Sequence, residues 1–306
     1  MGTEKTRRDV LKMGVATGSL AVVGSLAGCN GSVGGGGVGY RRWLYAPGAV
    51  GDSDHYSFTV TDHRDIRDNE DELGDLYDLF ASQEDSFPLS QMGVDYDEMN
   101  RNIAPENGTV IMGSFNESDV VSELEDNDNY EEEDDYEGYT VFSTTGQGTA
   151  NRVIGVNRRT AVAARSGLLG NANPQDVVET LIDTDDGSED RYASDNEDMR
   201  VVINRVGNGS IVNGSTQEET EETDAENGEF EGQVASGGRI RINGETMRRK
   251  QVLVFDSRDD VNTSDIEDWT ETDDFEDVDD ISVSQNGRRV AITGETDTDD
   301  FGGQSS

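Results

Sequence analysis

The chain is poor in the residues that most catalytic and metal sites need. Among its 306 residues are one cysteine, two histidines and three lysines. Catalytic triads use a base that is most often histidine, and structural zinc sites need several Cys or His ligands at short spacing. No G-x-S-x-G motif is present, and we interpret His55 and His63 as structural. The sequence therefore predicts no enzyme, no catalytic residue, no metal ligand and no cofactor.

Apolar residues and positive charge are also scarce. Only 32% of the residues are hydrophobic and 7% aromatic, which suits one or two small domains rather than a large enzyme core. There are 24 basic against 66 acidic residues, a net charge of −42. Nucleic acids are bound by basic surfaces, so the sequence predicts no nucleic-acid partner. We interpret the long acidic runs as solvated surface.

Two acidic stretches invite a calcium interpretation. Residues 126–129 and 183–187 alternate or cluster carboxylates. An EF-hand loop needs ligands at positions 1, 3 and 5, glycine at 6 and glutamate at 12. From Asp126 the fifth position is Tyr130, and from Asp183 the twelfth is Ser194. Neither stretch fits, so the sequence predicts no specific calcium site.

Residues 6–29 carry the clearest functional signal. The stretch contains a pair of arginines, a mildly apolar run at 13–27, and the only cysteine of the chain, Cys29. The run is about 15 residues long, as in export signals, and falls short of the roughly 20 needed to span a bilayer. The stretch matches all five defined positions of the S/T-R-R-x-x-L-K export pattern, with Thr6, Arg7, Arg8, Leu11 and Lys12.

This stretch resembles the signal of lipoproteins that leave the cell by the twin-arginine (Tat) route. Residues 26–29, Leu-Ala-Gly-Cys, resemble a lipobox, in which the thiol of Cys29 is acylated and becomes the new N-terminus. The resemblance implies two partners, the Tat export machinery and the membrane itself through lipid on Cys29, because two acyl chains anchor a protein stably. It places the chain on the outer face of the cell membrane. Any protein partner stays unidentified.

The acidic composition narrows the resemblance further. Residues 1–28 hold four basic and two acidic residues, so the rest of the chain has a net charge of −44. Such self-repulsion is strongly screened at molar salt, where the Debye length is about 3 Å. An acidic surface with few lysines and a Tat signal resembles haloarchaeal lipoproteins, a group mostly without assigned function. Intrinsic disorder is the competing interpretation.

We expect an α+β fold of antiparallel sheets with a few short helices. The expected order is a signal peptide at 1–28, a lipidated cysteine with a glycine-rich tether at 29–39, and a first α+β domain at 40–214. An acidic linker at 215–228, a smaller α+β domain at 229–295 and a disordered tail at 296–306 follow. Alternation and spacing predict a long helix over 65–80, a helix after Asn173-Pro174, and a strand at 199–206.

Two segments share an order of features. The stretches starting at residues 110 and 252 each predict a strand, a short helix, an acidic loop and a closing hairpin. This pattern indicates two related units of split-βαβ character, or a coincidence between acidic loops.

Six N-x-S/T sequons occur in the chain. Of these, Asn208 and Asn213 lie in a polar stretch where we expect a glycan to meet no packing obstacle.

The leading functional hypothesis is a non-catalytic, lipid-anchored extracellular protein of a halophile that acts through protein contacts or as an envelope component. The alternative is a solute-binding lipoprotein of a transport system. Such binding proteins usually have two large lobes of alternating strands and helices, and the sequence predicts too few helices for them.

Overall fold

We analysed a computed structural model of the chain, which describes residues 39–51, 53–144, 151–167 and 172–298. The export signal (Arg7, Arg8, Leu11, Lys12), Cys29 and the tether up to residue 38 lie outside the described residues, and so does the tail from 299 onward. Among the described residues, no helix is both long enough and apolar enough to cross a membrane.

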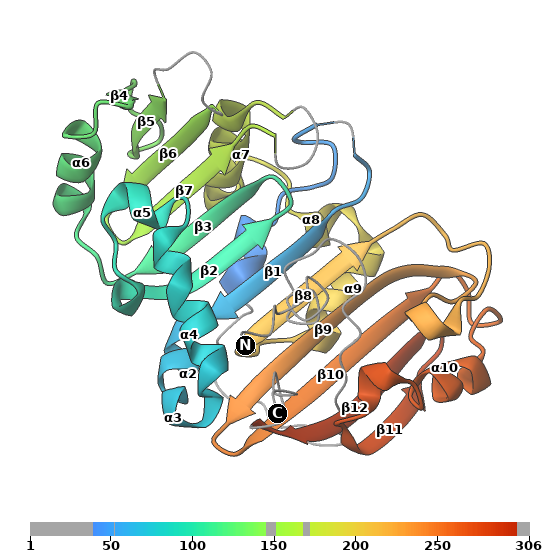
Figure 1. Cartoon of the computed structure of the whole chain (residues 1–306). Coiled ribbons are helices and arrows are strands. Elements are labelled where there is room, and N and C mark those ends of the chain that lie inside the picture. Colours follow the sequence, from blue (N-terminus) through green and yellow to red (C-terminus); the bar gives the residue numbers. More distant parts are fainter. Residues whose placement is uncertain (1–38, 52, 145–150, 168–171, 299–306) are drawn as a thin grey trace.

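Twelve strands form one sheet in which every paired neighbour is antiparallel (Figure 1). The order across the sheet is β11-β12-β10-β9-β8-β1-β2-β3-β7-β6-β5-β4. The strands are β1 (Ser57–Asp62), β2 (Met99–Pro105), β3 (Gly108–Gly113), β4 (Tyr130–Glu132), β5 (Thr140–Thr144), β6 (Arg152–Asn157), β7 (Thr160–Arg165), β8 (Ile211–Thr216), β9 (Gln233–Asn243), β10 (Thr246–Phe255), β11 (Asp279–Gln285) and β12 (Arg289–Asp297).

Short helices cover both faces of this sheet. The α-helices are α2 (His63–Arg67), α3 (Glu70–Leu73), α4 (Asp75–Ala81), α5 (Leu89–Met92), α6 (Glu117–Glu125), α7 (Pro174–Asp186), α8 (Tyr192–Asp195), α9 (Glu197–Val206) and α10 (Thr263–Trp269). The 3-10 helices are η1 (Gly39–Trp43), η2 (Ser82–Asp85), η3 (Tyr96–Glu98), η4 (Ala225–Asn227) and η5 (Asp273–Phe275). The fold is therefore of the expected α+β class.

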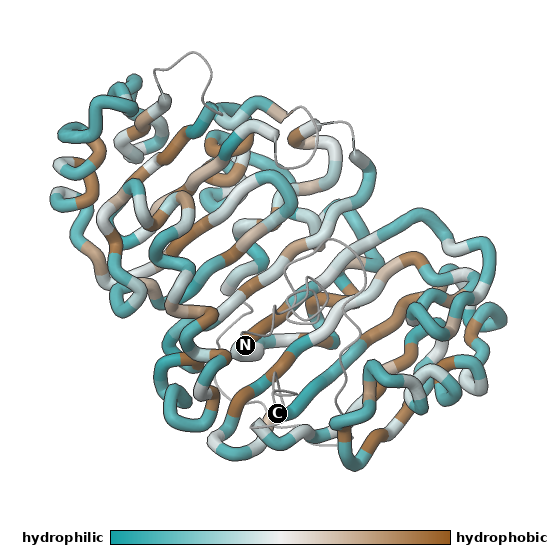
Figure 2. The backbone as a smooth tube through the Cα atoms, in the orientation of Figure 1, coloured by the Kyte–Doolittle hydropathy of each residue, from teal (hydrophilic) through white to brown (hydrophobic). Residues whose placement is uncertain are grey.

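The apolar side chains are divided between the two faces. In the view of Figure 1, η1, α7 and α9 lie behind the sheet, and their buried side chains form the largest hydrophobic cluster with the back-facing side chains of the strands. α2 to α6 and α10 lie in front and cover three smaller clusters. Figure 2 shows that the apolar residues lie mainly along the strands and in parts of the helices, whereas the surrounding loops are hydrophilic. The core is therefore several thin layers, as the low apolar content predicts.

Helix α7 illustrates how local signals and burial agree. Its N-cap Asn173 accepts a hydrogen bond from the backbone of Gln175, and Pro174 occupies the first turn. Its buried positions recur at helical spacing and face β6 and β7; they are Val177, Val178, Leu181 and Ile182. This helix, predicted from the sequence, ends at Asp186 and carries one wall of the pocket described below.

The strand predicted at 199–206 is wrong, because these residues form α9. The segment is rich in β-branched residues, which favour strands. Its fully buried residues, however, are spaced by three or four positions, and they are Met199, Val202, Ile203 and Val206. Asn196 caps the helix by accepting a hydrogen bond from the backbone of Met199. Helical spacing and the cap therefore outweigh strand propensity here.

The two segments with a shared order of features occupy equivalent places. In the first, β3 leads through α6 and two additional strands, β4 and β5, to β6, and β7 lies between β3 and β6. In the second, β10 leads through α10 to β11 without additional strands, and β12 lies between β10 and β11. Because each intervening strand is antiparallel to both neighbours, β3 and β6 are parallel, as are β10 and β11. Each half therefore contains the expected split-βαβ arrangement.

The sheet runs across the expected domain boundary. The boundary at 214/215 falls within β8, which pairs with β1 on one side and with β9 on the other. The polar stretch after β8 does not separate two cores either: Ala225 packs against the cluster of α10, and Asp224 and Glu229 form a bridge. Helix α9, which precedes the boundary, packs on the back faces of β8, β9 and β10. The two halves are therefore joined by a common helix as well as by a common sheet.

Two further expectations change. The long helix expected over 65–80 is broken into α2, α3 and α4, and Gly74, with a φ of +49°, separates the last two. The first residues of the tail expected at 296–306 belong to the sheet, because β12 continues to Asp297. Thr296 is buried and pairs with Met247 of β10, so this residue belongs to the strand and not to a tail.

Candidate functional site

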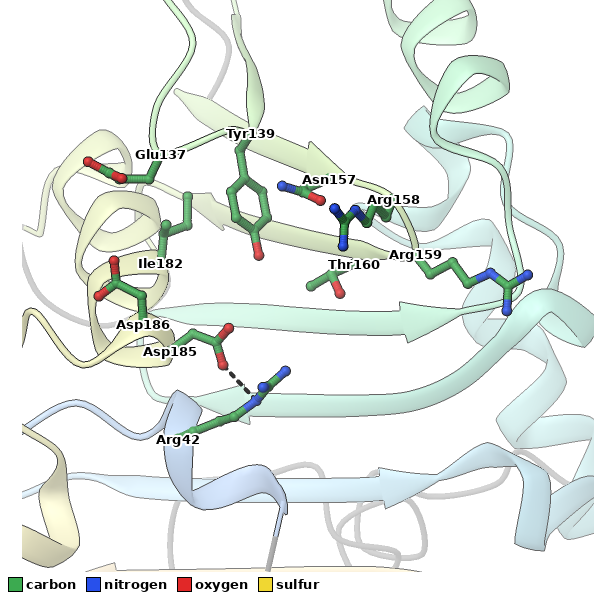
Figure 3. Close-up of a pocket in the computed structure, with 10 residues that line it drawn as sticks. All are labelled: Arg42, Glu137, Tyr139, Asn157, Arg158, Arg159, Thr160, Ile182, Asp185 and Asp186. Atoms are coloured by element: carbon green, nitrogen blue, oxygen red, sulfur yellow. Dashed lines mark ion pairs between the residues drawn. The ribbon is translucent and has the colours of Figure 1, made fainter.

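The candidate site is an open hollow where the β6–β7 hairpin meets the C-terminal end of α7 (Figure 3). Its volume is about 540 Å³. The residues lining it come from η1, the approach to β5, the hairpin and α7: Arg42, Glu137, Tyr139, Asn157, Arg158, Arg159, Thr160, Ile182, Asp185 and Asp186. We call this hollow the Arg158 pocket.

The hairpin turn places one arginine over the pocket. Arg158 and Arg159 are the two residues between β6 and β7, and Arg158 adopts a left-handed φ of +52°. The backbone N–H of Arg158 donates to Glu117 Oε2 at 2.6 Å, and Gly113 N–H donates to the carbonyl of Arg159 at 2.9 Å. These bonds tie the turn to α6 and β3. The turn is therefore held in place at both residues.

The opposite wall is an ion pair at the end of α7. Arg42 Nε lies 2.6 Å from Asp185 Oδ1. Arg191 steadies this end of the helix by donating to the carbonyls of Thr184 and Asp185 at 3.1 and 3.0 Å. Burial raises the pKa of the Asp185 carboxyl, and the guanidinium of Arg42 acts in the opposite direction. This wall therefore presents a paired, largely neutralised charge.

Tyr139 supplies the hydroxyl at the centre of the pocket, where Figure 3 shows its ring pointing toward the Arg42–Asp185 pair. Burial, and then the Asp185 carboxylate, raises the pKa of Tyr139 to about 12. The hydroxyl thus stays protonated at neutral pH and can both donate and accept a hydrogen bond.

The unpaired cation is on the hairpin side. Figure 3 shows the Arg158 side chain beside Asn157 at the pocket, whereas Arg159 points away from it. Neither guanidinium forms an ion pair within the described part of the chain, and both residues are exposed. A guanidinium presents a planar fork that matches a carboxylate or another oxyanion. The pocket is therefore suited to bind an anionic oxygen group between Arg158 and the Tyr139 hydroxyl.

The carboxylates at 183–187 have separate partners. Tyr136 donates its hydroxyl to Asp183 at 2.9 Å, Asp185 pairs with Arg42, and Asp186 accepts a bond from the backbone of Ser188. Among the described residues, no group of three or more His, Cys, Asp or Glu side chains is placed to hold a metal ion. The acidic end of α7 thus serves helix termination and the pocket wall.

The two favoured sequons lie in different surroundings. Asn208 is exposed in the loop after α9, and its carbonyl accepts a bond from Arg241 Nε at 3.0 Å. Asn213 instead lies in the middle of β8, half-buried, and its Oδ1 accepts a hydrogen bond from the backbone of Gly238. The expectation of an unobstructed polar stretch therefore differs from the structure at Asn213, because this residue is part of the sheet.

Sequence reasoning did not find the pocket residues. Arg42, Tyr139, Arg158 and Asp185 are separated by up to 143 positions and meet only through the sheet order. The arginine pair in the hairpin turn gave no distinguishing signal, because the chain has five such pairs, at 7–8, 41–42, 158–159, 248–249 and 288–289.

Comparison with known proteins finds solved structures of similar fold but assigns the chain to no family. No protein-family model matches the chain, and no curated protein matches it. Among solved structures, crystal form I of TP0453 gives a TM-score of 0.51 at 9% identity, over 85% of this chain and 96% of that one. Crystal form III gives 0.50 at 9% identity, with the same coverage. At this identity the likeness shows a shared α+β fold and nothing of function.

Proposed function

We propose that the chain is a non-catalytic, lipid-anchored protein of the outer cell surface, which binds an acidic group of a protein partner in the Arg158 pocket. The observation that carries this proposal is the unpaired guanidinium of Arg158 beside the protonated Tyr139 hydroxyl in an open hollow. A charge-assisted hydrogen bond to such a cation contributes about 1.5–3 kcal/mol. A carboxylate side chain or a C-terminus of the partner supplies the matching group.

The architecture favours a protein partner over a free solute. Solute sites usually enclose most of their ligand. Here Arg42 and Arg158, on opposite walls of the pocket, are both exposed, and 48% of the Arg42 side chain is accessible. Within the residues that the structure describes, all strands belong to one sheet, and no second lobe closes over the pocket. These features support a docking surface that receives a protruding side chain.

Quantitative co-purification tests the pocket. Full-length protein with Arg158→Glu is compared with wild type for the partner recovered from membranes at high salt. We expect recovery to fall about tenfold or more, as loss of a charge-assisted hydrogen bond predicts. Arg165→Glu is the matched control, since Arg165 is exposed at the far end of β7 and lines no part of the pocket. Equal recovery with both variants would refute the proposed site.

A thermal-shift screen tests the solute-binding alternative. Small anions such as dicarboxylates and acidic amino acids are added over a wide concentration range. A ligand at about 100 times its Kd stabilises a protein by roughly 2.7 kcal/mol, which raises Tm. A concentration-dependent rise that disappears in Arg158→Glu would favour solute binding over a protein partner.

The anchor and the export route are tested separately. Cys29→Ala should release the protein into the medium, because the acylated thiol is lost. Retention of this variant in the membrane fraction would contradict lipid anchoring. Replacing Arg7 and Arg8 by lysines should block export, and unchanged export would exclude the Tat route.

A further inference from the structure

Six cations gather on the back face of the sheet near the C-terminal end of α9. They lie on η1, α9 and the facing strands β9 and β10, and we call them the basic patch: Arg41, Arg205, Arg239, Arg241, Arg248 and Lys250. In a chain with a net charge of −42, this concentration is unexpected. Lys250 is the only lysine after residue 12.

The sheet register sets like charges directly opposite one another. Lys250 pairs with Arg239, and Arg248 pairs with Arg241, two residues along the same face. Directly opposed like charges destabilise a sheet. Burial, and then the nearby guanidinium groups of Arg239, Arg205 and Arg241, lowers the pKa of Lys250. At least four of the six cations are therefore close enough to repel one another.

Internal contacts account for only part of the patch. Arg239 donates to the carbonyl of Val206 at 2.8 Å, and Arg241 to that of Asn208 at 3.0 Å, so both satisfy carbonyls at and beyond the end of α9. Arg248 pairs with Glu295 at 2.8 Å. Within the described part of the chain, Lys250 and Arg205 form no ion pair. Positive charge therefore remains for an external anion.

The patch lies where the chain enters the fold from its N-terminal side. Gly39 lies next to Arg101, and Arg41 Nη2 donates to Asn204 Oδ1 at 2.6 Å beside Arg205. If Cys29 carries the lipid, nine residues separate it from Gly39. The ten residue steps from Cys29 to Gly39 span at most about 36 Å when fully extended. The anchor thus holds this entry point close to the bilayer.

We propose that the basic patch docks on the phosphate headgroups of anionic lipids and orients the protein on its membrane, with the acidic remainder directed outward. This proposal rests on the proposed lipid anchor, which keeps the patch at high effective concentration near the surface, so that weak contacts suffice. The overall negative charge does not prevent docking, because the Debye length is about 8 Å at physiological salt and shorter in brine. A hydrogen bond between a guanidinium and a phosphate is about 2.7–2.9 Å long, which is shorter than the Debye length, so salt screens it less than the repulsion between distant charges.

Vesicle flotation of the chain from residue 29 onward tests docking apart from anchoring. With Cys29→Ala this chain has neither the lipid nor the basic, apolar signal at 1–28. It is mixed with vesicles of phosphatidylcholine alone, or with vesicles that contain about 30% phosphatidylglycerol as a moderately anionic surface. Folding is checked by circular dichroism at the same salt. We expect binding to the anionic vesicles only. Because Arg205 and Lys250 are the patch cations without an ion pair in the described part of the chain, Arg205→Glu/Lys250→Glu should lower the partition coefficient at least about tenfold.

The matched control is Arg165→Glu/Arg258→Glu, which changes the net charge equally at two exposed arginines outside the patch. Its binding should match that of the parent within about twofold if the patch alone contacts the headgroups. Equal loss in both double variants, equal binding to both vesicles, or no binding would overturn docking. A concentration-dependent dimer in ultracentrifugation without vesicle binding would instead assign the patch to a second copy. Flotation of wild type against Cys29→Ala reports on the anchor independently.

Discussion

His63 makes the stability of this protein depend on pH in a calculable way. Its side chain is fully buried under α4, with its ring edge-on to Tyr96 at 5.3 Å and to Phe80 at 6.3 Å. Nδ1 lies 3.2 Å from the Tyr96 hydroxyl, while Nε2 has no hydrogen-bond partner within the described part of the chain. Burial, then the neighbouring guanidinium of Arg67, lowers the pKa of His63 to about 4, against a smaller opposite effect of Asp62.

The sign follows from proton binding. In the unfolded chain His63 binds a proton below about pH 6.5, whereas the folded protein resists it down to about 4. The stabilisation by neutral His63 is therefore complete above pH 6.5 and is lost as the pH falls toward 4. Each pH unit in this window costs about 1.4 kcal/mol, which gives roughly 3 kcal/mol in all.

The assay compares unfolding free energies of wild type and His63→Gln from pH 7 to pH 4 at fixed salt. Wild type should lose about 3 kcal/mol more than the variant, because glutamine does not titrate. Tyr96→Phe serves as control: it removes the hydroxyl next to Nδ1 but leaves the ring buried, so its pH dependence should follow wild type. Parallel curves for wild type and His63→Gln would refute the reasoning.

Three further substitutions or measurements follow from local geometry. Gly237→Val should destabilise by about 3 kcal/mol in chemical denaturation, because a Cβ there would lie 2.4 Å from Val202 of α9; a change below 0.5 kcal/mol would mean that the helix shifts freely. Asn262→Ala should cost about 1 kcal/mol in thermal unfolding, since it removes the N-cap that accepts from Ser264 at 3.1 Å. Peptide mapping by mass spectrometry before and after deglycosylation should show Asn208 unmodified if the adjacent Arg241 docks on lipid; full occupancy there would contradict docking.

Local periodicity predicted most of the elements that pack in an ordinary way. In the stretch from residue 110, the predicted short helix and closing hairpin correspond to α6 and to β6 with β7; the helix has its buried positions at helical spacing, and the two strands are short continuous apolar runs. Strand β8 was missed. Its Asn213-Gly214 pair has the composition of a turn, yet a Cβ at Gly214 would lie 2.7 Å from the ring of Phe58. Here a close approach, and not a bend, requires glycine.

The pocket was beyond sequence reasoning for a different reason. Its acidic and basic residues do not differ from the many others in the sequence, and they form a pocket only because the order of the strands brings them together. Asp185 was considered as a calcium ligand because of its neighbours in sequence, but Arg42, 143 positions away, pairs with it. No periodicity or spacing rule reports such a contact.

The shared sheet leads to a test of domain independence. The back face of β9 and β10, with Val252 and Val254, is covered by α9, which precedes the expected linker. A fragment of residues 229–298 would expose this face to water. Burying such a side chain is worth about 1.5–3 kcal/mol, so we expect no cooperative melting by circular dichroism.

A fragment of residues 195–298 restores α9 and β8 and should regain part of the transition. Its remaining weakness is the exposed edge of β8, which in the whole chain pairs with β1 over five residues from Ser57 to Thr61. If the shorter fragment melts cooperatively at the same temperature as the longer one, the second half is an independent domain, and α9 contributes nothing to its stability. If only the longer fragment melts cooperatively, the second half depends on a helix from the first, and the chain folds around one continuous sheet.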